Sequence, residues 1–346
     1  MKSLITERLI LRKFSIDDFE AVHSYASNNE HVAFVPWGPN SEEETREYID
    51  FAIEKSEESP ISEYRFAVVC KETDSLIGDC EIIVKDDEAT LAWHMHPNHC
   101  KKGYGTETAL ALIDFGFSVL GLRRIIAHCD SENISSYRVM EKAGMRREGL
   151  FLETRKINKL SDKEYSDELI YAILRDEWEI KKDLARYYSL PFVFDDFIDV
   201  PELNDGVIYL VCISKQSAIP EKKYVPSYTF AICKGGEKIG EINLRIGYKG
   251  GLNGENLYYG GQIGYGIDEK YRGNGYAVRA CRLLGPVAKA HQMMKLYISN
   301  DVNNIASRRV CEKIGARFLR KARVPGWHDL YAGGTRFINI YEWSLE

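Results

Sequence analysis

The chain has 346 residues, of which 45% are hydrophobic, and it carries a formal net charge of −6. This length exceeds what one hydrophobic core usually organises, so we expect two domains of ordinary size. The acidic balance argues against a general nucleic-acid surface, the charged start excludes a signal-peptide core, and no apolar stretch is long enough to cross a bilayer.

The first predicted elements are a strand at residues 9–13 and two capped helices. Ser15 with Asp18 three residues on has the spacing of a capping box, and Ser41 with Glu44 repeats it. Apolar residues follow each pair at helical spacing. We therefore expect a strand and then two helices before the main sheet begins.

A run of strands and two further helices completes the first half. Alternating apolar residues predict strands at 64–71, 76–84 and 90–96, and later at 124–129, 145–154 and 165–174. A helix with apolar residues every three or four positions ends at Gly121, and a short one runs from Asn133 to Gly144. The order is that of a mixed α/β fold.

Two motifs occur twice. K-K-G-Y-G-T-E-T-A at 101–109 returns as G-N-G-Y-A-V-R-A at 273–280, and each is followed by N-I-x-S-x-R-V-x-E-K-x-G, starting at Asn133 and Asn304. Their separation along the chain is preserved to within one residue. This indicates a tandem duplication of whole domains, which we place at 1–180 and 190–346 with a short linker near 178–191.

The second half repeats the first from its hairpin onward. We predict strands at 207–214, 228–233, 238–246 and 262–267. Only a proline-containing run separates the first two, so the two opening helices are expected to be lost or shortened. The extra residues of this half fall in a Gly, Asn and Tyr-rich loop at 248–261.

The glycine motif lies between a strand and a helix, which is where a diphosphate can bind. Backbone N–H groups of the turn point at the anion, and the helix dipole favours it. A Rossmann site requires a third glycine, but Thr108 and Val278 occupy that position. No Walker A sequence is present.

Together the two motifs resemble the GNAT acetyltransferase superfamily, in which Q/R-x-x-G-x-G/A binds the diphosphate of acetyl-coenzyme A. The second copy matches fully from Arg272 to Ala277, whereas the first has Cys100 at the Q/R position. The first domain looks most like the RimJ/RimL branch, through T-E-R-L-I-L-R near its start. The resemblance implies two consecutive GNAT-type acyl-CoA N-acyltransferase domains, each with a mixed sheet (α/β, α+β).

The resemblance also implies a mechanism and a set of coenzyme A-binding residues. The strand before the motif, 92–96 or 264–268, would part from its neighbour at a bulge and bind the pantetheine arm. An amine would attack the thioester directly, and the amide near Met95 or Ile267 would stabilise the oxyanion. The expected binding residues are Met95, Cys100, Lys101, Lys102, Gly103, Tyr104, Gly105, Thr106, Asn133, Ile267, Arg272, Gly273, Asn274, Gly275, Tyr276, Ala277 and Asn304.

Several residues are candidates for the general base. His128 lies where relatives place a glutamate, and it could act near neutral pH or be an ordinary strand histidine. Glu81 and Asp79 share a strand face and are the alternatives, unless that face is simply solvated. In the second copy Ser299 replaces His128, which leaves Glu241 as the candidate.

The tyrosine that serves as general acid in many relatives is replaced by Met140 and Cys311. Ser136 and Ser307 could assist the leaving thiolate, as a serine does in some RimL-like members, or they could only cap a helix. Cys100 is more simply a neutral packing residue than a nucleophile.

The expected acceptor is a primary amine, on a peptide N-terminus or on a small molecule such as an aminoglycoside-like antibiotic. Aromatic residues could line its pocket or belong to the core, and they are Trp37, Trp93, Tyr258, Tyr259 and Tyr265. The acidic runs 42–44 and 86–88 would suit a cation or be ordinary surface.

Two other interpretations stay open: one copy catalyses while the other is a scaffold, or the chain is a coenzyme A-dependent sensor. We expect no metal, no nucleic acid and no membrane partner, and a monomer or a homodimer. The eight cysteines form no C-x-x-C pair, which fits a reducing cytoplasm.

Overall fold

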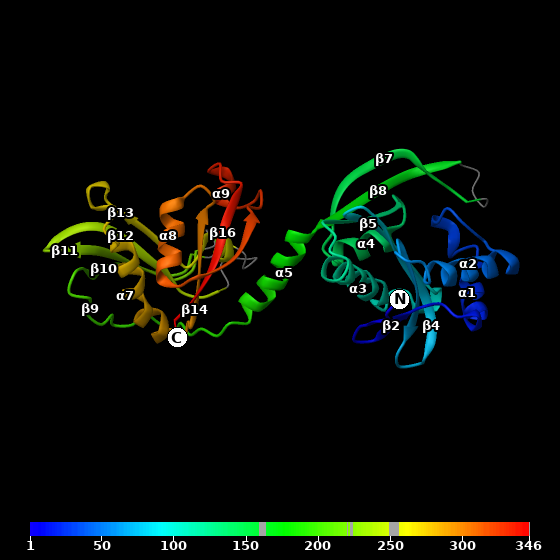
Figure 1. Ribbon diagram of the computed structural model, residues 1–346, viewed down its shortest axis with the longest axis horizontal. Coiled ribbons are helices and arrows are strands. Elements are labelled where there is room, and N and C mark those ends of the chain that lie inside the picture. Colours follow the sequence, from blue (N-terminus) through cyan, green and yellow to red (C-terminus); the bar gives the residue numbers. More distant parts are fainter. Residues whose placement is uncertain (159–163, 220, 222–223, 249–255, 346) are drawn as a thin grey trace. The chain divides into compact units, whose positions relative to one another are not determined.

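The computed structural model describes residues 1–158, 164–219, 221, 224–248 and 256–345. The chain folds into two compact units, Met1–Trp178 and Glu179–Glu346 (Figure 1). The division falls within the stretch where the sequence predicts a linker. Each unit is described by itself.

The first unit contains one sheet of eight strands in the order β1-β2-β3-β4-β5-β6-β8-β7. The β5–β6 ladder is parallel and the other ladders are antiparallel. The strands are β1 Leu4–Ile5, β2 Leu9–Arg12, β3 Glu63–Cys70, β4 Ser75–Lys85, β5 Glu88–Met95, β6 Arg124–Asp130, β7 Arg146–Lys156 and β8 Tyr165–Leu174.

Helices lie on both faces of this sheet (Figure 1). They are η1 Ile16–Asp18, α1 Phe19–Ala26, η2 Val32–Phe34, α2 Glu42–Lys55, η3 Pro97–His99, α3 Tyr104–Ser118 and α4 Ile134–Lys142. The capping boxes predicted at Ser15 and Ser41 are confirmed, because both the side-chain and the backbone halves of each box form. The predicted cap Asn133 also accepts a backbone hydrogen bond at the start of α4.

Two apolar cores enclose the sheet of the first unit. The larger one packs strand residues such as Phe66 and Ile82 against Leu112 of α3. The smaller one packs Tyr25 of α1 and Ile49 of α2 over the opposite face, which we call the α1–α2 face. The cores hold the strand that precedes the glycine motif between two layers of helices.

The second unit divides its strands between two sheets, with orders β13-β12-β11-β10-β9 and β14-β16-β15. The strands are β9 Leu203–Asn204, β10 Tyr209–Gln216, β11 Ser227–Lys234, β12 Glu237–Arg245, β13 Ile263–Ile267, β14 Lys295–Asp301, β15 Arg317–Arg323 and β16 Phe337–Ser344. The helices are α5 Arg175–Tyr188, which begins before the division, α6 Asn256–Gly260, η5 Glu269–Tyr271, α7 Tyr276–Ala290, α8 Ile305–Ile314 and α9 Asp329–Ala332.

The described residues contain no counterpart of α1 and α2 in the second unit. Between β10 and β11 they show an isolated bridge joining Ile219 and Tyr224. This agrees with the predicted loss of the opening helices. The predicted loop at 248–261 differs in its last part, because α6 forms there and buries Leu257 and Tyr258. Residues 249–255 lie outside the described residues.

The predicted linker near 178–191 needs a correction. Residues up to Tyr188 form helix α5, and Ile180, Leu184 and Tyr187 are buried in the core of the second unit. Their spacing of four and three residues places them on one face of a helix. The charged residues between them make this apolar stripe hard to recognise in the sequence.

Two of the predicted acceptor aromatics belong to the core of the second unit. Tyr258 is 0% exposed and Tyr259 is 4% exposed. The Tyr258 ring packs against Tyr187 and Tyr297, with centroids 5.5 Å and 6.0 Å away. The structure thus favours the core alternative for both residues.

Candidate functional site

The turn between β5 and α3 holds two residues in the left-handed backbone region. Lys101 has a φ of +61° and Gly103 a φ of +85°. Gly103 is the N-cap of α3, so the N–H groups of the first helical turn have no partner within the helix. These amides and the positive end of the helix dipole can receive an anion.

The turn before α7 has the same backbone. Gly273 has a φ of +83° and Gly275, the N-cap of α7, a φ of +77°. Lys101 therefore occupies the position of Gly273 and keeps its left-handed conformation without being glycine. For a residue with a side chain this conformation costs about 1–2 kcal/mol.

In each unit, the residue before the turn contacts the carbonyl group at the equivalent position of the preceding strand. In the second unit the Arg272 Nε donates to the carbonyl oxygen of Ile267 at 3.0 Å. In the first unit the Cys100 Sγ lies 3.6 Å from the carbonyl oxygen of Met95. Burial raises the pKa of the Cys100 thiol, which supports the neutral role predicted for it.

Next to each turn, the preceding strand has parted from its neighbour. The β5–β6 ladder ends at Leu91 and Ala127, whereas the ladder with β4 continues to Met95 opposite Gly78. In the second unit β13 and β14 belong to different sheets. The predicted parting is present in both units, but the β4–β5 register is continuous, so the predicted bulge is absent from this ladder.

The open edge of β5 presents the amide of Met95. The His96 N–H donates to the Ile77 carbonyl, and hydrogen-bonded pairs alternate along an antiparallel ladder. The N–H of Met95 therefore points away from β4, toward the gap left by β6. Ile267 lies in the same position, because the Asp268 N–H donates to Ile239.

In the second unit the turn and the open strand line one pocket of about 530 Å³. Its lining includes every binding residue predicted for this half, namely Ile267, Arg272, Gly273, Asn274, Gly275, Tyr276, Ala277 and Asn304. An adjoining cleft of about 480 Å³ is lined by Arg279, Arg282 and Lys313. The geometry thus brings the predicted residues together beside basic side chains.

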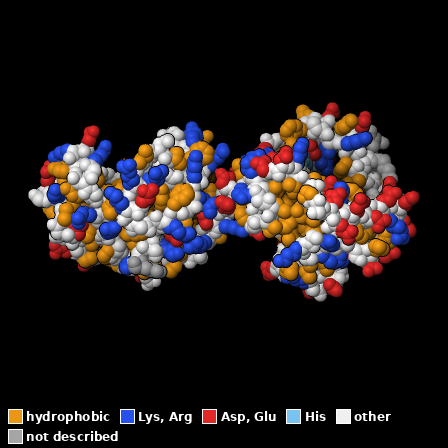
Figure 2. Space-filling view, in the orientation of Figure 1, with side chains coloured by type: hydrophobic (Ala, Val, Ile, Leu, Met, Phe, Trp, Pro, Cys, Tyr) orange, Lys and Arg blue, Asp and Glu red, His pale blue; other side chains and the backbone are white. Residues whose placement is uncertain are grey.

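On the face drawn in Figure 2, basic side chains are interspersed with acidic ones. The basic residues at the pocket and the cleft come from α7, α8 and the turn before α7. This distribution suits a compact anion at the turn.

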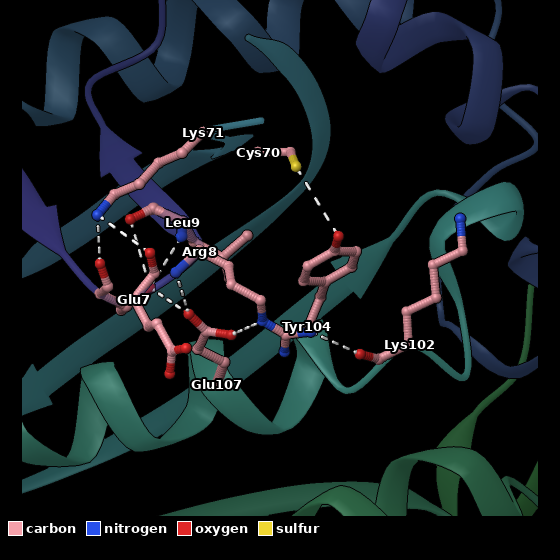
Figure 3. A network of polar contacts seen from close by, with 9 residues as sticks. Glu7, Arg8, Leu9, Cys70, Lys71, Lys102, Tyr104 and Glu107 are labelled. Atoms are coloured by element: carbon pink, nitrogen blue, oxygen red, sulfur yellow. Dashed lines mark hydrogen bonds and ion pairs between the residues drawn. The ribbon is translucent and has the colours of Figure 1, made fainter. Parts of the chain in front are cut away.

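An ionic network that the sequence analysis missed supports the turn of the first unit (Figure 3). The Arg8 Nε donates to Glu107 Oε2 at 2.7 Å, and its Nη1 donates to the Lys102 carbonyl at 3.0 Å. The Arg8 guanidinium also lies over the Tyr104 ring, 4.6 Å from its centroid. Arg8 thus ties the β1–β2 turn to the glycine turn.

The second unit contains this network with the charges exchanged. Arg279, at the position of Glu107, pairs with Asp205 at 2.8 Å. Lys234 donates to the hydroxyl of Tyr276, the counterpart of Tyr104, at 2.6 Å. Local sequence patterns could not reveal either network, because the paired residues lie far apart in sequence.

The second motif places an asparagine cap at the start of α4 and another at the start of α8. The Asn133 side chain accepts from the Ser136 N–H at 3.1 Å, and Asn304 accepts from Ser307 at 3.0 Å. The Ser307 hydroxyl also meets the Tyr265 hydroxyl at 2.9 Å inside the pocket. The caps are therefore Asn133 and Asn304. Ser136 and Ser307, considered as caps, only donate their backbone N–H groups to them, and the hydroxyl of Ser307 lies at the pocket.

The α1–α2 face of the first unit carries a buried polar cluster. His94 Nδ1 lies 2.9 Å from Asp79 Oδ1, and the Tyr25 hydroxyl donates to Asp79 Oδ2 at 2.5 Å. Burial alone would raise the pKa of Asp79, but the charge and hydrogen bond of His94 outweigh it and lower that pKa. The sequence analysis placed Asp79 on this face and missed His94.

The other predicted bases of the first unit have their own partners. Glu81 is paired with Arg65, and burial, opposed by Arg65, leaves the Glu81 pKa above its ordinary value. His128 Nδ1 lies 3.5 Å from Glu168 Oε2. Both residues lie on the α1–α2 face, because the neighbours of each along its own strand belong to the core on the opposite face.

The predicted base of the second unit lies outside the pocket. Glu241 is paired with Lys238 at 2.5 Å, and half of its side chain is exposed. It faces Gly266, whereas Asp79 faces His94. Among the described residues no helix covers this face, so Glu241 is exposed whereas Asp79 is buried, and the base role of Glu241 stays a prediction.

Among the described residues, no group of three or more His, Cys, Asp or Glu side chains is arranged to hold a metal ion. Within the same part of the chain, no helix combines the length and apolar character of a membrane span.

Comparison with known proteins identifies the family. The family described as an acetyltransferase (GNAT) domain matches residues 8–146 and again 210–317. The uncharacterized N-acetyltransferase YnaD of Bacillus subtilis (strain 168) is 38% identical over 177 residues, which cover 51% of this chain and 98% of that protein. The uncharacterized N-acetyltransferase p20 of Bacillus licheniformis is 32% identical over 45% of this chain and 89% of its own length.

A solved structure of a GNAT-family acetyltransferase from Bacillus anthracis is 35% identical and covers 51% of this chain and 100% of its own, with a TM-score of 0.45. The family match covers most of both units. This chain therefore belongs to the GNAT acetyltransferase family and carries two copies of its domain.

Proposed function

We propose that this chain transfers the acetyl group of acetyl-coenzyme A to a primary amine by direct attack of the amine on the thioester. The observation that carries the proposal is the open strand edge beside a glycine turn, which occurs in both units. The turn supplies amides for a diphosphate, and the strand edge supplies amides for the pantetheine arm and the thioester carbonyl.

The residues present fit such a carrier. The pocket of the second unit joins Ile267 on the strand edge to Gly273 and Gly275 in the turn, within one volume of about 530 Å³. The Met95 N–H would stabilise the oxyanion in the first unit, and the Ile267 N–H would do so in the second. Arg282 and Lys313 beside the turn would favour a polyanionic carrier.

Within this function we assign the chemical step to the first unit. A protonated amine must lose a proton before it attacks, so a base has to lie near the open strand. The first unit places His94, Glu81 and His128 on the face at this gap. The second unit presents Gly266 and an exposed Glu241 instead, which favours a carrier-binding or scaffold role for it.

The acceptor is proposed as the amine of a peptide N-terminus or of a small molecule. Nitrogen as the acceptor atom is supported by relatives that are named N-acetyltransferases. The half-buried Trp37 suits a cation that carries some apolar surface.

Calorimetry on the full chain with acetyl-coenzyme A tests carrier binding, together with the variants Gly103→Glu and Gly275→Glu. Each substitution places a side chain at a φ near +80° and a carboxylate at the anion site. We expect two binding sites in the unaltered chain and one in each variant. Gly121→Glu is the matched control, because it also has a positive φ, +72°, but follows the C-terminal end of α3, the opposite end of that helix from the glycine turn, and lines neither the pocket nor the cleft.

Release of coenzyme A thiol tests the reaction, with a tetrapeptide bearing a free N-terminus and kanamycin as acceptor probes. We expect amine-stimulated release that Gly103→Glu abolishes and Gly275→Glu retains. If neither unit binds acetyl-coenzyme A at millimolar concentration, the proposal is refuted. Binding without thiol release would leave the sensor interpretation in its place.

A further inference from the structure

The residue before Met95 on the open strand is part of a side-chain dyad. His94 lies opposite Asp79 in the β4–β5 register, and its Nδ1 lies 2.9 Å from Asp79 Oδ1. The second oxygen of Asp79 accepts the Tyr25 hydroxyl at 2.5 Å. Both carboxylate oxygens are therefore engaged, which fixes the plane of the carboxylate and the direction in which it holds the imidazole.

The surroundings seal Asp79 and leave part of His94 accessible. The exposed fraction is 6% for the Asp79 side chain and 19% for the His94 side chain. The Trp37 ring stands edge to face against His94, with centroids 5.0 Å apart. Because Nδ1 points at Asp79, the accessible part of the ring carries Nε2, which is free to accept a proton when the imidazole is neutral.

A separate clamp holds the segment that carries Trp37. The Asn158 side chain donates to the carbonyl oxygens of Val32 at 2.6 Å and Val35 at 3.1 Å. This amide comes from the residues after β7, far along the chain from the segment it binds. The wall beside His94 is thereby fixed by two parts of the first unit.

The dyad lies at the gap where the thioester is expected. His94 precedes Met95, whose N–H points into the space left by β6, and His94 itself lies on the α1–α2 face. A thioester carbonyl bound at the Met95 amide would thus have the imidazole one residue away along the strand.

We propose that His94 is the general base of the first unit and that Asp79 is its positioning residue. This assignment rests on the proposed acetyl transfer to an amine. The neutral Nε2 takes one proton from the acceptor ammonium, and the freed nitrogen lone pair forms the C–N bond to the thioester carbonyl carbon. The C–S bond then breaks with its electron pair on sulfur, the second amine proton passes to sulfur, and His94 releases its proton to solvent.

The two other candidates on this face are less suited to the role. Glu81 is paired with Arg65, which also donates to Glu63 at 3.1 Å, so Glu81 would have to give up its partner to accept a proton. His128 lies 3.5 Å from Glu168, longer than a well-formed hydrogen bond, and Glu168 is shared with Arg155 at 3.0 Å. Only His94 is oriented by a carboxylate that is itself fixed.

Charged groups of β4 and β7 act on the imidazole, and two other titratable groups, His31 and Tyr25, lie in or just after α1. Burial would lower the pKa of His94, but Asp79 and then Glu81 raise it above its ordinary value, while Arg155 opposes them. Burial and the charge of His94 lower the pKa of His31 to about 4, and burial raises the pKa of Tyr25, so neither titrates near neutrality. Activity should therefore increase as the pH rises through the elevated pKa of His94.

The activity test uses the full chain carrying Gly275→Glu, so that thiol release reports the first unit. We expect His94→Gln to reduce turnover by about 100-fold or more, without a change in the Kd for acetyl-coenzyme A. Asp79→Asn should move the acidic limb of the pH profile to lower pH, because it removes the charge that raises the pKa of His94. His23→Gln, which alters a histidine of α1 bonded to Thr45, is the matched control and should keep the unaltered rate.

A measurement without turnover complements these rates. The His94 ring resonance, assigned by its loss in His94→Gln, should titrate above 6.5 in the unaltered chain and at lower pH in Asp79→Asn, which removes the charge that raises the pKa of His94. Thiol release that survives His94→Gln, or a resonance that ignores Asp79→Asn, would overturn the base assignment alone. Absence of amine-stimulated release from the unaltered chain would overturn the proposed function and the base role together.

Discussion

The two units share one backbone arrangement and differ in the helices that cover their sheets. In each, an open strand leads into a turn with two left-handed residues and then into a helix. In the first unit α1 and α2 cover one sheet face, and Asp79 beneath them is 4% exposed. In the second unit the equivalent Glu241 is exposed and faces a glycine.

This contrast shows which features tolerate change. The turn keeps its shape although Lys101 replaces a glycine, a cysteine replaces Arg272, and the supporting ion pair exchanges its charges. Main-chain amides form the anion site, so any side chain that preserves the backbone is compatible with it. An acid-base group needs a defined environment, and it loses that environment when the covering helices are absent.

The largest effect is expected at a glycine that both units require. A Cβ on Gly78 would lie 2.1 Å from the His94 carbonyl oxygen, and one on Gly240 would lie 2.3 Å from that of Gly266. Each oxygen belongs to the open strand, so the strand must move. We expect Gly78→Ala and Gly240→Ala each to lower the free energy of unfolding by about 1–3 kcal/mol, measured by denaturant titration.

The two glycine variants should differ in turnover. Gly78→Ala displaces His94 and Met95 and should reduce thiol release, whereas Gly240→Ala should leave the first unit active. Gly326→Ala is a control for glycine replacement, because no atom lies within 4 Å of its Cβ position and its φ lies outside the left-handed region. Equal losses of activity in both variants would contradict the assignment of chemistry to the first unit.

The next largest effect is expected at the ion pair of Arg8 with Glu107, whose charges are exchanged in the second unit. Glu107→Gln removes an acceptor of Arg8, whose guanidinium also holds the Lys102 carbonyl. We expect acetyl-coenzyme A to bind the first unit about three- to tenfold more weakly, a modest loss because Arg8 is partly exposed. Arg279→Gln should have the corresponding effect on the second unit, and calorimetry in the Gly275→Glu or Gly103→Glu background separates the two sites.

A charge exchange within the first unit sharpens this test. The double variant Arg8→Asp with Glu107→Arg imitates the polarity found at Asp205 and Arg279. Its affinity should exceed that of Glu107→Arg alone, which places two cations together. If the double variant is no better than the single one, the pair does not support the turn.

Local sequence signals predicted the fold well, whereas contacts across strands were beyond them. The caps at Ser15, Ser41 and Asn133 follow from neighbouring residues, and the structure confirms them. The His94–Asp79 dyad depends on the β4–β5 register, and a shift of one residue would place the two side chains on opposite faces. Sequence spacing alone does not fix that register.

Two other differences have equally specific causes. The pairing of Arg8 with Glu107 joins segments about a hundred residues apart, so no local pattern could indicate it. The stripe of Ile180, Leu184 and Tyr187 was visible in the sequence, but the charges around it favoured a linker. The loss of α1 and α2 from the second unit was readable, because prolines occupy the interval.

A smaller effect should appear in how the stability of each unit depends on pH. Asp79 raises the pKa of His94 against the effect of burial. The contribution of the His94–Asp79 pair to stability is therefore complete below about pH 6.5 and is lost as the pH rises through the pKa of His94 in the folded state. Burial lowers the pKa of His291, opposed by the Val193 carbonyl, so its contribution is present above 6.5 and is lost as the pH falls.

Hydrogen exchange followed by mass spectrometry can measure this difference in each unit. The protection lost in His94→Gln should shrink as the pH rises above neutrality, and the protection lost in His291→Gln should shrink as the pH falls below it. The same trend in both variants would show that the two histidines do not differ in environment as the structure indicates.

The smallest effect is expected where the turns differ by a single side chain. Lys101 adopts a φ of +61° at the position of Gly273, and glycine reaches this region without the clash of a Cβ. Lys101→Gly should therefore raise the free energy of unfolding of the first unit by about 0.5–1 kcal/mol, part of the gain being offset by the freer unfolded chain. Calorimetry should show weaker acetyl-coenzyme A binding in the same variant, because a cation beside the anion site is removed. A variant that is both less stable and unchanged in affinity would mean that the lysine was neither strained nor facing the carrier.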